Sequence, residues 1–373
     1  MKIAIINISG SGISGGYKKY LFEMIPRLIN HNGVEEILCI YPMAWSMASW
    51  FTNLKNVYFL AHDIHPILPL KRNSLKSAIN NFKPDVIFVP TERYFRSGNI
   101  PVVNMVQNME PFVDLQIDYI LKTKVKLKIQ NFFGKIAVRN SDGLIALSSF
   151  VRTVLSKEIG IKKTSLIYHG VNQPDSDGKK PINLPKNLNK DFIFTAGSIL
   201  PARGLEDLIL ALRFLKLDNN NHKLVIAGHS IIKSNKYYKH LLKLINKYDL
   251  KNSIFWTGPI NEDEMRWCFQ NSKIFVMTSR VESFGLIAVE AMANGCVCIS
   301  TDSQCLPEIF DSAAFFYKSG NYKNLASLIR ANIKLDSSKV TAIAKKAVKR
   351  SLDFSWDICA NKTISFLHRV ASK

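Results

Sequence analysis

Short apolar runs alternate with helix-length segments along most of this chain, and this alternation limits the fold more than any other feature of the sequence. The runs are rich in β-branched and aromatic residues and are bounded by Gly, Pro, Asn or Asp, as strands are. In the first half we expect strands at residues 2–8, 36–41, 57–60, 85–89, 101–106, 143–147 and 165–168. Helix-length segments such as 16–32 and 73–82 separate several of them, so the pattern predicts an α/β protein with parallel sheets.

The stretch 172–190 interrupts this alternation, and its three prolines indicate a linker. The alternation then resumes, with expected strands at 191–196, 223–227, 253–256, 273–277 and 296–300 and expected helices at 204–215, 236–249, 262–270 and 285–294. We therefore expect one Rossmann-like domain over residues 1–175 and a second over 188–355, with a last helix at 356–371 that packs back on the first. Two such domains predict a cleft at the carboxyl ends of the strands, where ligands bind.

The composition excludes several classes of protein. With 47% hydrophobic and 21% charged residues, the chain is globular rather than disordered. No apolar run approaches the roughly 18 residues that span a bilayer, and the apolar start at residues 3–8 is too short for a signal peptide. None of the six cysteines forms a Cys-x-x-Cys pair, so we expect buried free thiols in a reducing compartment.

The net charge of +21 leaves three interpretations open, namely attraction to an anionic membrane surface, binding of nucleic acid, and a compositional bias toward lysine. The charge is spread over the whole chain, and no nucleic-acid-binding motif organises it. We therefore expect no nucleic-acid partner.

The segment 279–295 carries the strongest chemical signal. Glu290 stands in an expected helix whose other residues from 286 to 293 are apolar, which predicts a buried helix. A buried carboxylate is costly unless it is hydrogen-bonded, so Glu290 either caps a backbone group or accepts hydrogen bonds from the hydroxyls of a bound polyol. Glu282 precedes this helix, in the loop after the strand expected at 273–277.

The start of the same helix offers a place for a phosphate. Gly285 allows the backbone to approach a ligand closely. The amides of Phe284, Gly285 and Leu286 open the helix, and a helix N-terminus binds phosphate well. The segment thus combines two carboxylates with a phosphate cradle, which suits a sugar diphosphate with a ribose behind it.

Two further turns between a strand and a helix point to a ligand. Arg203 follows the first strand of the second domain, where its guanidinium could clamp a diphosphate and stabilise a departing nucleotide. The alternative is a surface arginine at a helix start. The glycine-rich turn 9–17, which includes Gly16, suggests a backbone close to a phosphate or sugar, although it lacks the dinucleotide-binding spacing.

These residues resemble glycosyltransferase family 4, a large family of retaining enzymes with two Rossmann-like domains, the GT-B architecture. The resemblance covers nearly the whole chain and is carried by residues 203–204, 282–286, 290–295, 225–228, 306–308, 15–16 and 169–172. The most specific of these features is the pair of glutamates, Glu282 and Glu290, with seven residues between them.

The resemblance implies an enzyme that transfers a hexose-type sugar from a nucleotide-diphosphate sugar to an acceptor. The transfer would retain the anomeric configuration and need neither a metal nor a cofactor. The resemblance places Glu282 near the reacting centre of the donor sugar, Glu290 at the ribose and Arg203 at the diphosphate. It also implies donor-binding roles for Gly16, Ser283, Phe284, Gly285 and Leu286.

Two positions depart from the pattern of the family. Ser198 stands where the family often has an arginine, so one phosphate-binding cation is missing. Gln107 and Asn108 stand where the family often has His-Asp, and neither side chain is a base at neutral pH. We expect Asn108 to act in the catalytic site by hydrogen bonding. The Gln-Asn-Met sequence is similar to that of enzymes that build surface polysaccharides such as O-antigen or capsule on a glycan or lipid-linked acceptor.

Residues 119–139 hold six Lys or Arg residues and no acidic residue. Their apolar residues recur at near-helical spacing, at Leu121, Val125, Ile129, Phe132, Phe133 and Ile136. The segment is either a basic amphipathic helix that lies on an anionic membrane or an ordinary helix with a lysine-rich solvated side. The first alternative predicts a cytoplasmic protein that attaches to the inner face of a membrane.

Two other functions stay open at this point. A nucleotide-sugar epimerase would bind the same donor but would need acid and base residues beside it. A non-catalytic sugar-binding relic would account for the departures at Ser198 and Gln107. The donor is expected to be a GDP- or UDP-sugar, and no residue distinguishes the two bases.

Overall fold

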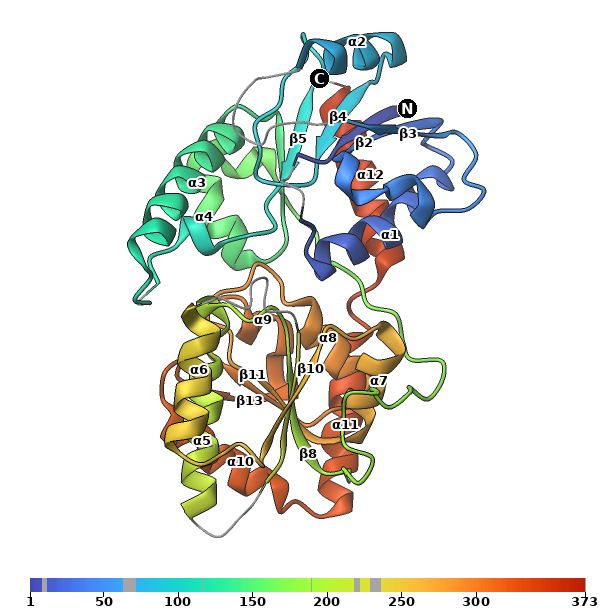
Figure 1. Ribbon diagram of the computed structural model, residues 1–373. Helices are drawn as coiled ribbons and strands as arrows, with labels where there is room; N and C mark the ends of the chain where they lie inside the picture. Colours follow the sequence, from blue (N-terminus) through green and yellow to red (C-terminus); the bar gives the residue numbers. More distant parts are fainter. Residues whose placement is uncertain are drawn as a thin grey trace. The chain divides into compact units, whose positions relative to one another are not determined.

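The computed structural model describes residues 1–8, 12–62, 72–115, 117–188, 190–217, 222–228 and 236–372. Contacts within the chain divide it into two compact units, drawn in Figure 1. The first unit consists of Met1–Asp114, Ile120–Gly170 and Ser355–Lys373, and the second of Leu115–Tyr119 and Val171–Phe354. The last helix of the chain therefore belongs to the first unit.

The first unit is built on a seven-stranded parallel sheet in the order β3-β2-β1-β4-β5-β6-β7. The strands are β1 (Lys2–Ile6), β2 (Glu36–Tyr41), β3 (Val57–Ala61), β4 (Val86–Val89), β5 (Val102–Met105), β6 (Gly143–Ala146) and β7 (Thr164–Leu166). The helices are α1 (Gly15–Ile29), α2 (Arg72–Phe82), α3 (Leu121–Arg139), α4 (Ser149–Ile159) and α12 (Trp356–Ala371). Short 3-10 turns are η1 (Met43–Trp45), η2 (Met47–Trp50), η3 (Glu110–Phe112) and η4 (Ile161–Lys163).

The second unit has a six-stranded parallel sheet in the order β10-β9-β8-β11-β12-β13. The strands are β8 (Phe192–Ala196), β9 (Leu224–Ala227), β10 (Ile254–Gly258), β11 (Ser272–Met277), β12 (Cys298–Thr301) and β13 (Ala314–Tyr317). The helices are α5 (Leu205–Leu217), α6 (Lys236–Lys247), α7 (Glu262–Asn271), α8 (Leu286–Ala293), α9 (Leu306–Phe310), α10 (Tyr322–Ile333) and α11 (Ser337–Ser351). Two 3-10 turns, η5 (Pro201–Arg203) and η6 (Asp311–Ala313), complete the unit.

Strand β8 shows why helices cover both faces of this sheet. Successive side chains of a strand point to opposite faces. Ile193 therefore joins the apolar cluster formed with α5, α6 and α10. Phe192 points the other way and stacks on Trp267 of α7 at 5.8 Å between ring centroids, while Phe194 lies 5.3 Å from Phe269 of the same helix. Both faces are apolar, as in parallel sheets covered by helices.

The structure confirms the expected α/β class with parallel sheets and every expected strand to within two residues. The described residues of the stretch 172–190 form neither helix nor strand. Strand β13 and helices α9 to α11 follow the last expected strand and were not predicted. All six cysteines are buried free thiols, as expected. In the described part of the chain, no helix is long and apolar enough to cross a bilayer.

Candidate active site

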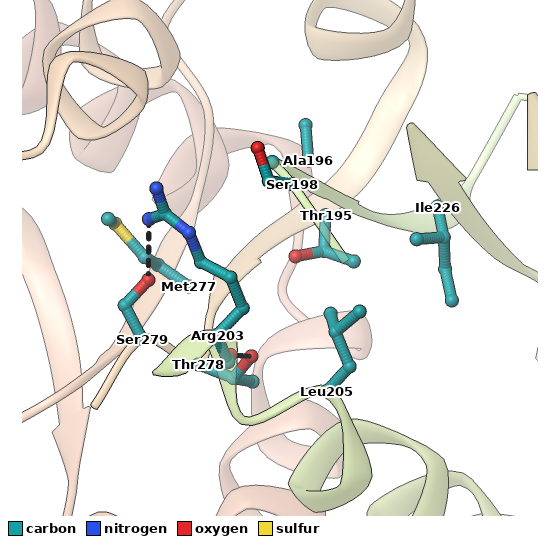
Figure 2. Close-up of a pocket in the computed structure, with 10 residues that line it drawn as sticks. Thr195, Ala196, Ser198, Arg203, Leu205, Ile226, Met277, Thr278 and Ser279 are labelled. Carbon is teal, nitrogen blue, oxygen red and sulfur yellow. Dashed lines mark hydrogen bonds between the residues drawn. The ribbon is translucent and has the colours of Figure 1, made fainter. Parts of the chain in front are cut away.

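A pocket lies in the second unit where β8 and β11 end side by side (Figure 2). The chain order of the sheet reverses between these two strands, and ligands of such sheets bind outside the carboxyl ends at this reversal. The pocket is a hollow open to solvent, and the space of about 260 Å³ beside its lining includes that open part. Its lining consists of Thr195, Ala196, Gly197, Ser198, Arg203, Leu205, Ile226, Met277, Thr278 and Ser279.

Arg203 and Glu282, two of the predicted site residues, are in contact beside this pocket. The Arg203 guanidinium forms an ion pair with Glu282 and donates a hydrogen bond from Nη1 to Ser279 Oγ at 3.1 Å. Ser279 Oγ in turn donates to Glu282 Oε1 at 2.9 Å. We call these three residues the Arg203 cluster. It places a cation, a hydroxyl and a carboxylate at the carboxyl end of β11.

The turn that carries Arg203 is fastened to the end of β11. Thr278 Oγ1 donates a hydrogen bond to the carbonyl oxygen of Arg203 at 2.6 Å. The backbone amide of Arg280 donates one to the carbonyl oxygen of Ala202 at 2.8 Å. Gly204 has a φ of 59°, and a Cβ at this position would lie 2.5 Å from the carbonyl oxygen of Thr278. Only glycine therefore fits where the turn passes the strand, and the backbone beneath Arg203 is fixed.

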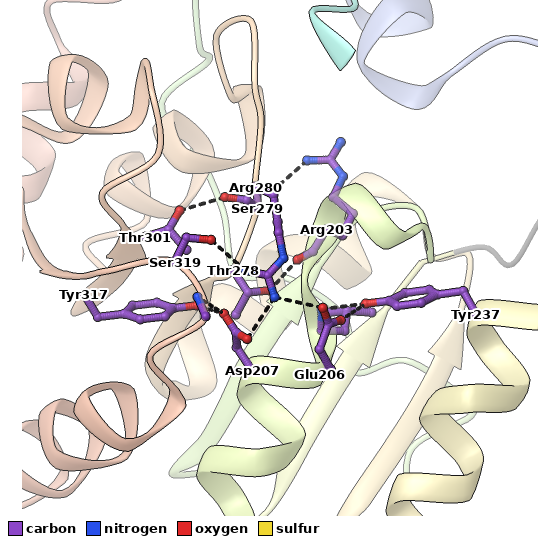
Figure 3. Close-up of polar contacts among 12 residues, drawn as sticks. Arg203, Glu206, Asp207, Tyr237, Thr278, Ser279, Arg280, Thr301, Tyr317 and Ser319 are labelled. Atoms are coloured by element: carbon purple, nitrogen blue, oxygen red, sulfur yellow. Dashed lines mark hydrogen bonds and ion pairs between the residues drawn. The ribbon is translucent and has the colours of Figure 1, made fainter. Parts of the chain in front are cut away.

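A second ionic cluster supports this turn from the side of α5 (Figure 3). Arg280 Nη2 donates to Glu206 at 2.8 Å and to Asp207 at 2.9 Å, and its Nη1 donates to Ser319 Oγ at 2.7 Å. Tyr237 donates to the Glu206 carboxylate. Burial alone would lower the pKa of Arg280, but the neighbouring Asp207 and Glu206 carboxylates outweigh it and raise that pKa above its usual value.

Helix α8 begins at the glycine that the sequence singled out. Gly285 caps the helix with a φ of 88°, which favours glycine, and the eight residues of α8 follow it. Ser283 and Phe284 are buried, and the Phe284 ring packs edge-on against Phe354 at 5.5 Å. The Cys305 thiol donates to the carbonyl oxygen of Glu282 at 3.3 Å. These contacts hold the loop between β11 and α8 against the body of the unit.

The prediction that Glu290 lies in a helix buried all round is wrong. Glu290 is half-buried, and so are Leu286 and Ile287. Residues at these positions share one side of a helix, because they lie within about 100° of each other at 3.6 residues per turn. The remaining apolar residues of α8 suffice to pack against the unit, so this side stays partly open. Glu290 is therefore accessible from outside the core.

Gly16 and Asn108, the other predicted site residues, belong to the first unit. Gly16 is the second residue of α1, whose start is capped by Ser14 accepting a hydrogen bond from the Tyr17 amide at 3.2 Å. Residues 9–11 of the glycine-rich turn lie outside the described residues. Asn108 follows β5 and accepts a hydrogen bond from the Glu110 amide at 3.0 Å. Both residues thus lie beyond the carboxyl ends of central strands.

Sequence reasoning missed Ser279, which joins Arg203 to Glu282, and the Arg280–Asp207 ion pair beside it. Glu206 and Asp207 stand in the first turn of α5, where acidic residues commonly complement the helix dipole. Because this ordinary role already accounts for both acidic residues, the sequence does not indicate that Asp207 pairs with Arg280, 73 residues later. Ser198, which replaces an arginine of the family pattern, lines the pocket, so this departure lies within the site.

Within the described residues, no three His, Cys, Asp or Glu side chains are grouped as metal ligands. The sequence does contain an Asp-x-Asp triplet at 175–177, a common metal-binding pattern. Asp175 is exposed and pairs with Arg266 at 3.2 Å. This carboxylate is thus engaged by an arginine of α7.

Each half of the chain matches a glycosyltransferase family model. The family model described as Glycosyltransferase Family 4 matches residues 14–173, and the one described as Glycosyl transferases group 1 matches residues 177–350. The chain is 28% identical over 169 residues to the uncharacterized glycosyltransferase YqgM of Bacillus subtilis, which covers 45% of this chain and 44% of that protein. It is 21% identical over 201 residues to the O-antigen chain mannosyltransferase RfbU of Salmonella typhimurium, covering 53% of each. The chain thus spans about half the length of these curated relatives.

Among solved structures, the chain is similar to Anabaena Alr3699/HepE in complex with UDP-glucose. The TM-score is 0.72 at 17% sequence identity, and the match covers 100% of both chains. At this identity the likeness concerns the fold alone, and it confirms the expected GT-B class. With both halves matched by glycosyltransferase models, the chain belongs to the glycosyltransferases, with a Family 4 first half and a group 1 second half.

Proposed function

We propose that the chain transfers a hexose-type sugar from a nucleotide-diphosphate sugar to a glycan or lipid-linked acceptor during surface polysaccharide synthesis. The transfer retains the anomeric configuration and uses no metal. The observation that carries this proposal is the Arg203 cluster at the reversal point of the second sheet, where a guanidinium borders the pocket beside a carboxylate. The name of the relative RfbU makes a mannosyl donor the first to test.

In this proposal Arg203 binds the diphosphate of the donor. A guanidinium binds a diphosphate more strongly than a neutral side chain would, because its hydrogen bonds are charge-assisted and can be bidentate. The amides at the start of α8, from Ser283 to Leu286, supply further donors to the phosphates. Glu290, on the open side of α8, accepts hydrogen bonds from the ribose hydroxyls. Glu282 contacts the donor sugar near its reacting carbon.

The chemical step needs stabilisation of the leaving group more than a strong base. The bond between the anomeric carbon and the diphosphate oxygen breaks through an oxocarbenium-like state, and a bond to the acceptor oxygen forms on the same face. Arg203 and the α8 amides stabilise the negative charge on the departing diphosphate. The acceptor hydroxyl gives its proton to a leaving phosphate oxygen, while Asn108 and Gly16 hold the reactants in place.

Product analysis tests this proposal directly. The protein is incubated with GDP-mannose or UDP-glucose, with and without a lipid-linked glycan acceptor and with a chelator present. We expect free nucleoside diphosphate and a glycosylated acceptor whose new linkage has the configuration of the donor, as read by NMR. Conversion of the donor sugar without an acceptor would instead indicate an epimerase. Donor binding without any product across a panel of acceptors would indicate a non-catalytic relic.

A further inference from the structure

Helix α3 of the first unit turns its most apolar side outward. Its inner side is made by Gly134, Ala137 and Val138, which are buried. A Cβ at Gly134 would lie 2.5 Å from the Phe112 ring, so the helix approaches η3 closely. Asn131 Nδ2 donates to the carbonyl oxygen of Pro111 at 2.6 Å on the same side. The seating of α3 on the unit is therefore fixed by small and polar residues, and its large apolar residues lie elsewhere.

Four large apolar residues of α3 are exposed. Leu121 is 77% exposed, Val125 48%, Ile129 43% and Phe132 61%. At 3.6 residues per turn, these four positions fall within an arc of about 80°. We call this arc the apolar stripe of α3. An ordinary surface helix turns such a stripe toward the core, whereas α3 exposes it.

Exposed lysines border the apolar stripe on both sides. Helix geometry places Lys122 and Lys126 along one edge and Lys124 and Lys128 along the other, and all four are exposed. Farther along the helix, Lys135 and Arg139 form ion pairs with Glu158 of α4, at 3.0 and 2.7 Å. The first half of α3 thus presents an apolar strip between two rows of positive charge.

We infer that α3 is a membrane-docking helix, whose apolar stripe enters the surface of a bilayer that contains anionic phospholipid. A helix lying in the bilayer plane buries its apolar face at the boundary between headgroups and acyl chains. Lysines at the two edges reach the headgroup level, where each one near an anionic surface strengthens binding about fivefold, the equivalent of about 1 kcal/mol. The net charge of +21 favours the same surface.

The charges beside the apolar stripe favour an anionic bilayer over a second copy of this chain as its binding partner. A second copy of this chain would bring the same lysine rows face to face, and like charges at short distance repel. An anionic bilayer instead offers acyl chains for the stripe and phosphates for both rows. Because docking needs neither donor nor turnover, the inference stands apart from the proposed transferase reaction.

Vesicle flotation with the full chain tests the inference. The vesicles are phosphatidylcholine alone or with phosphatidylglycerol, at low and at high salt. Two variants are compared with wild type, L121S/I129S/F132S on the apolar stripe and K122Q/K126Q/K128Q on its borders. We expect the wild type to float with the anionic vesicles at low salt, and each variant to bind them at least about tenfold more weakly. High salt should weaken the binding of the wild type, because it screens exposed charges.

Matched control variants separate α3 from the charge and apolar surface of the whole protein. K345Q/K346Q/K349Q removes three exposed lysines of α11 in the second unit, and I182S/L217S/L352S removes three exposed apolar residues of that unit. Both controls should bind within about twofold of wild type. Thermal unfolding and donor-induced stabilisation, measured on every variant, verify that folding and the donor site are intact.

Three results would overturn the inference. One is that both α3 variants bind the anionic vesicles as strongly as the wild type does. Another is that the α11 variant K345Q/K346Q/K349Q loses as much binding as the α3 variants, which would show that the overall charge of the protein drives binding. The third is no vesicle binding together with a concentration-dependent dimer that L121S/I129S/F132S abolishes, which would make the stripe a contact between copies. A failure of catalysis with vesicle binding intact would refute the proposed function alone.

Discussion

Arg280 links three segments of the second unit through a single guanidinium. It pairs with Glu206 and Asp207 at the start of α5 and donates to Ser319 beyond β13. Asp207 also accepts a hydrogen bond from the Gly320 amide at 2.9 Å. Because Asp207 is buried, its charge depends on these partners. The turn that presents Arg203 to the pocket rests on this cluster.

We predict that Arg280→Gln destabilises the second unit by about 3–5 kcal/mol, because it leaves two carboxylates close together without their cation. Urea unfolding followed by fluorescence measures the change. In the double variant R280Q/D207N the loss should be smaller than the sum of the single losses by about 1–3 kcal/mol. An R280Q protein as stable as wild type would show that the cluster does not support the unit.

Single residues show where sequence reasoning reached its limit. The glutamate pair and Arg203 stand out because a carboxylate in an apolar helix and an arginine at a strand end are unusual choices. The hydrogen bond from Arg203 to Ser279, which links Arg203 to Glu282, joins residues 76 apart, and no local pattern encodes it. The partial exposure of Glu290 could not be predicted either, because apolar neighbours in sequence do not reveal how many of them the fold covers.

Among the elements, α12 packs on the first unit through contacts that include one buried histidine, His169. The His169 ring lies 4.8 Å from the ring of Tyr20 on α1 and 5.7 Å from that of Trp356 at the start of α12. Next to it, a Cβ at Gly170 would lie 2.1 Å from the Trp356 amide nitrogen. Burial lowers the pKa of His169 from 6.5 to about 3. The ring is therefore neutral where α12 packs.

This depressed pKa predicts a pH-dependent stability. Between about pH 6.5 and pH 3 the unfolded chain binds a proton at His169 that the folded chain does not, so stability rises with pH across this window. Stability should fall by about 2 kcal/mol from about pH 7.5 to pH 5, beyond the change seen in His169→Phe. Denaturant unfolding at several pH values measures both proteins. Equal pH dependence in the two would contradict the assignment.

The elements differ in how far the sequence predicts them. The central strands of both sheets are uniform apolar runs between turn residues, and each was found. Strand β13 was not predicted, although its four residues, Ala-Phe-Phe-Tyr, are also an apolar run; it lies at the edge of the sheet. For α3 the spacing of apolar residues predicted the helix, but only the packing of Gly134 against Phe112 reveals that the apolar stripe points outward.

At the scale of the whole molecule, we propose a different role for each of the two units. The second unit carries the Arg203 cluster and α8, which we assign to the donor. The first unit carries Asn108 and the apolar stripe of α3, which we assign to the acceptor side and to the membrane. A lipid-linked acceptor would meet both assignments, because its carrier resides in the bilayer that α3 would contact.

The central claim is that Arg203 holds the diphosphate of a nucleotide sugar. Its control is Arg213 of α5, which lies 4.3 Å over the Tyr248 ring and does not line the pocket. The decisive measurement is the thermal unfolding of wild type, R203A and R213A with GDP-mannose, UDP-glucose and the free nucleotides, in the presence of a chelator. We predict that one donor at about a hundred times its Kd stabilises wild type and R213A by about 2.7 kcal/mol, and that R203A loses most of this gain. Equal stabilisation of R203A, or no shift of wild type with any donor, would contradict the claim.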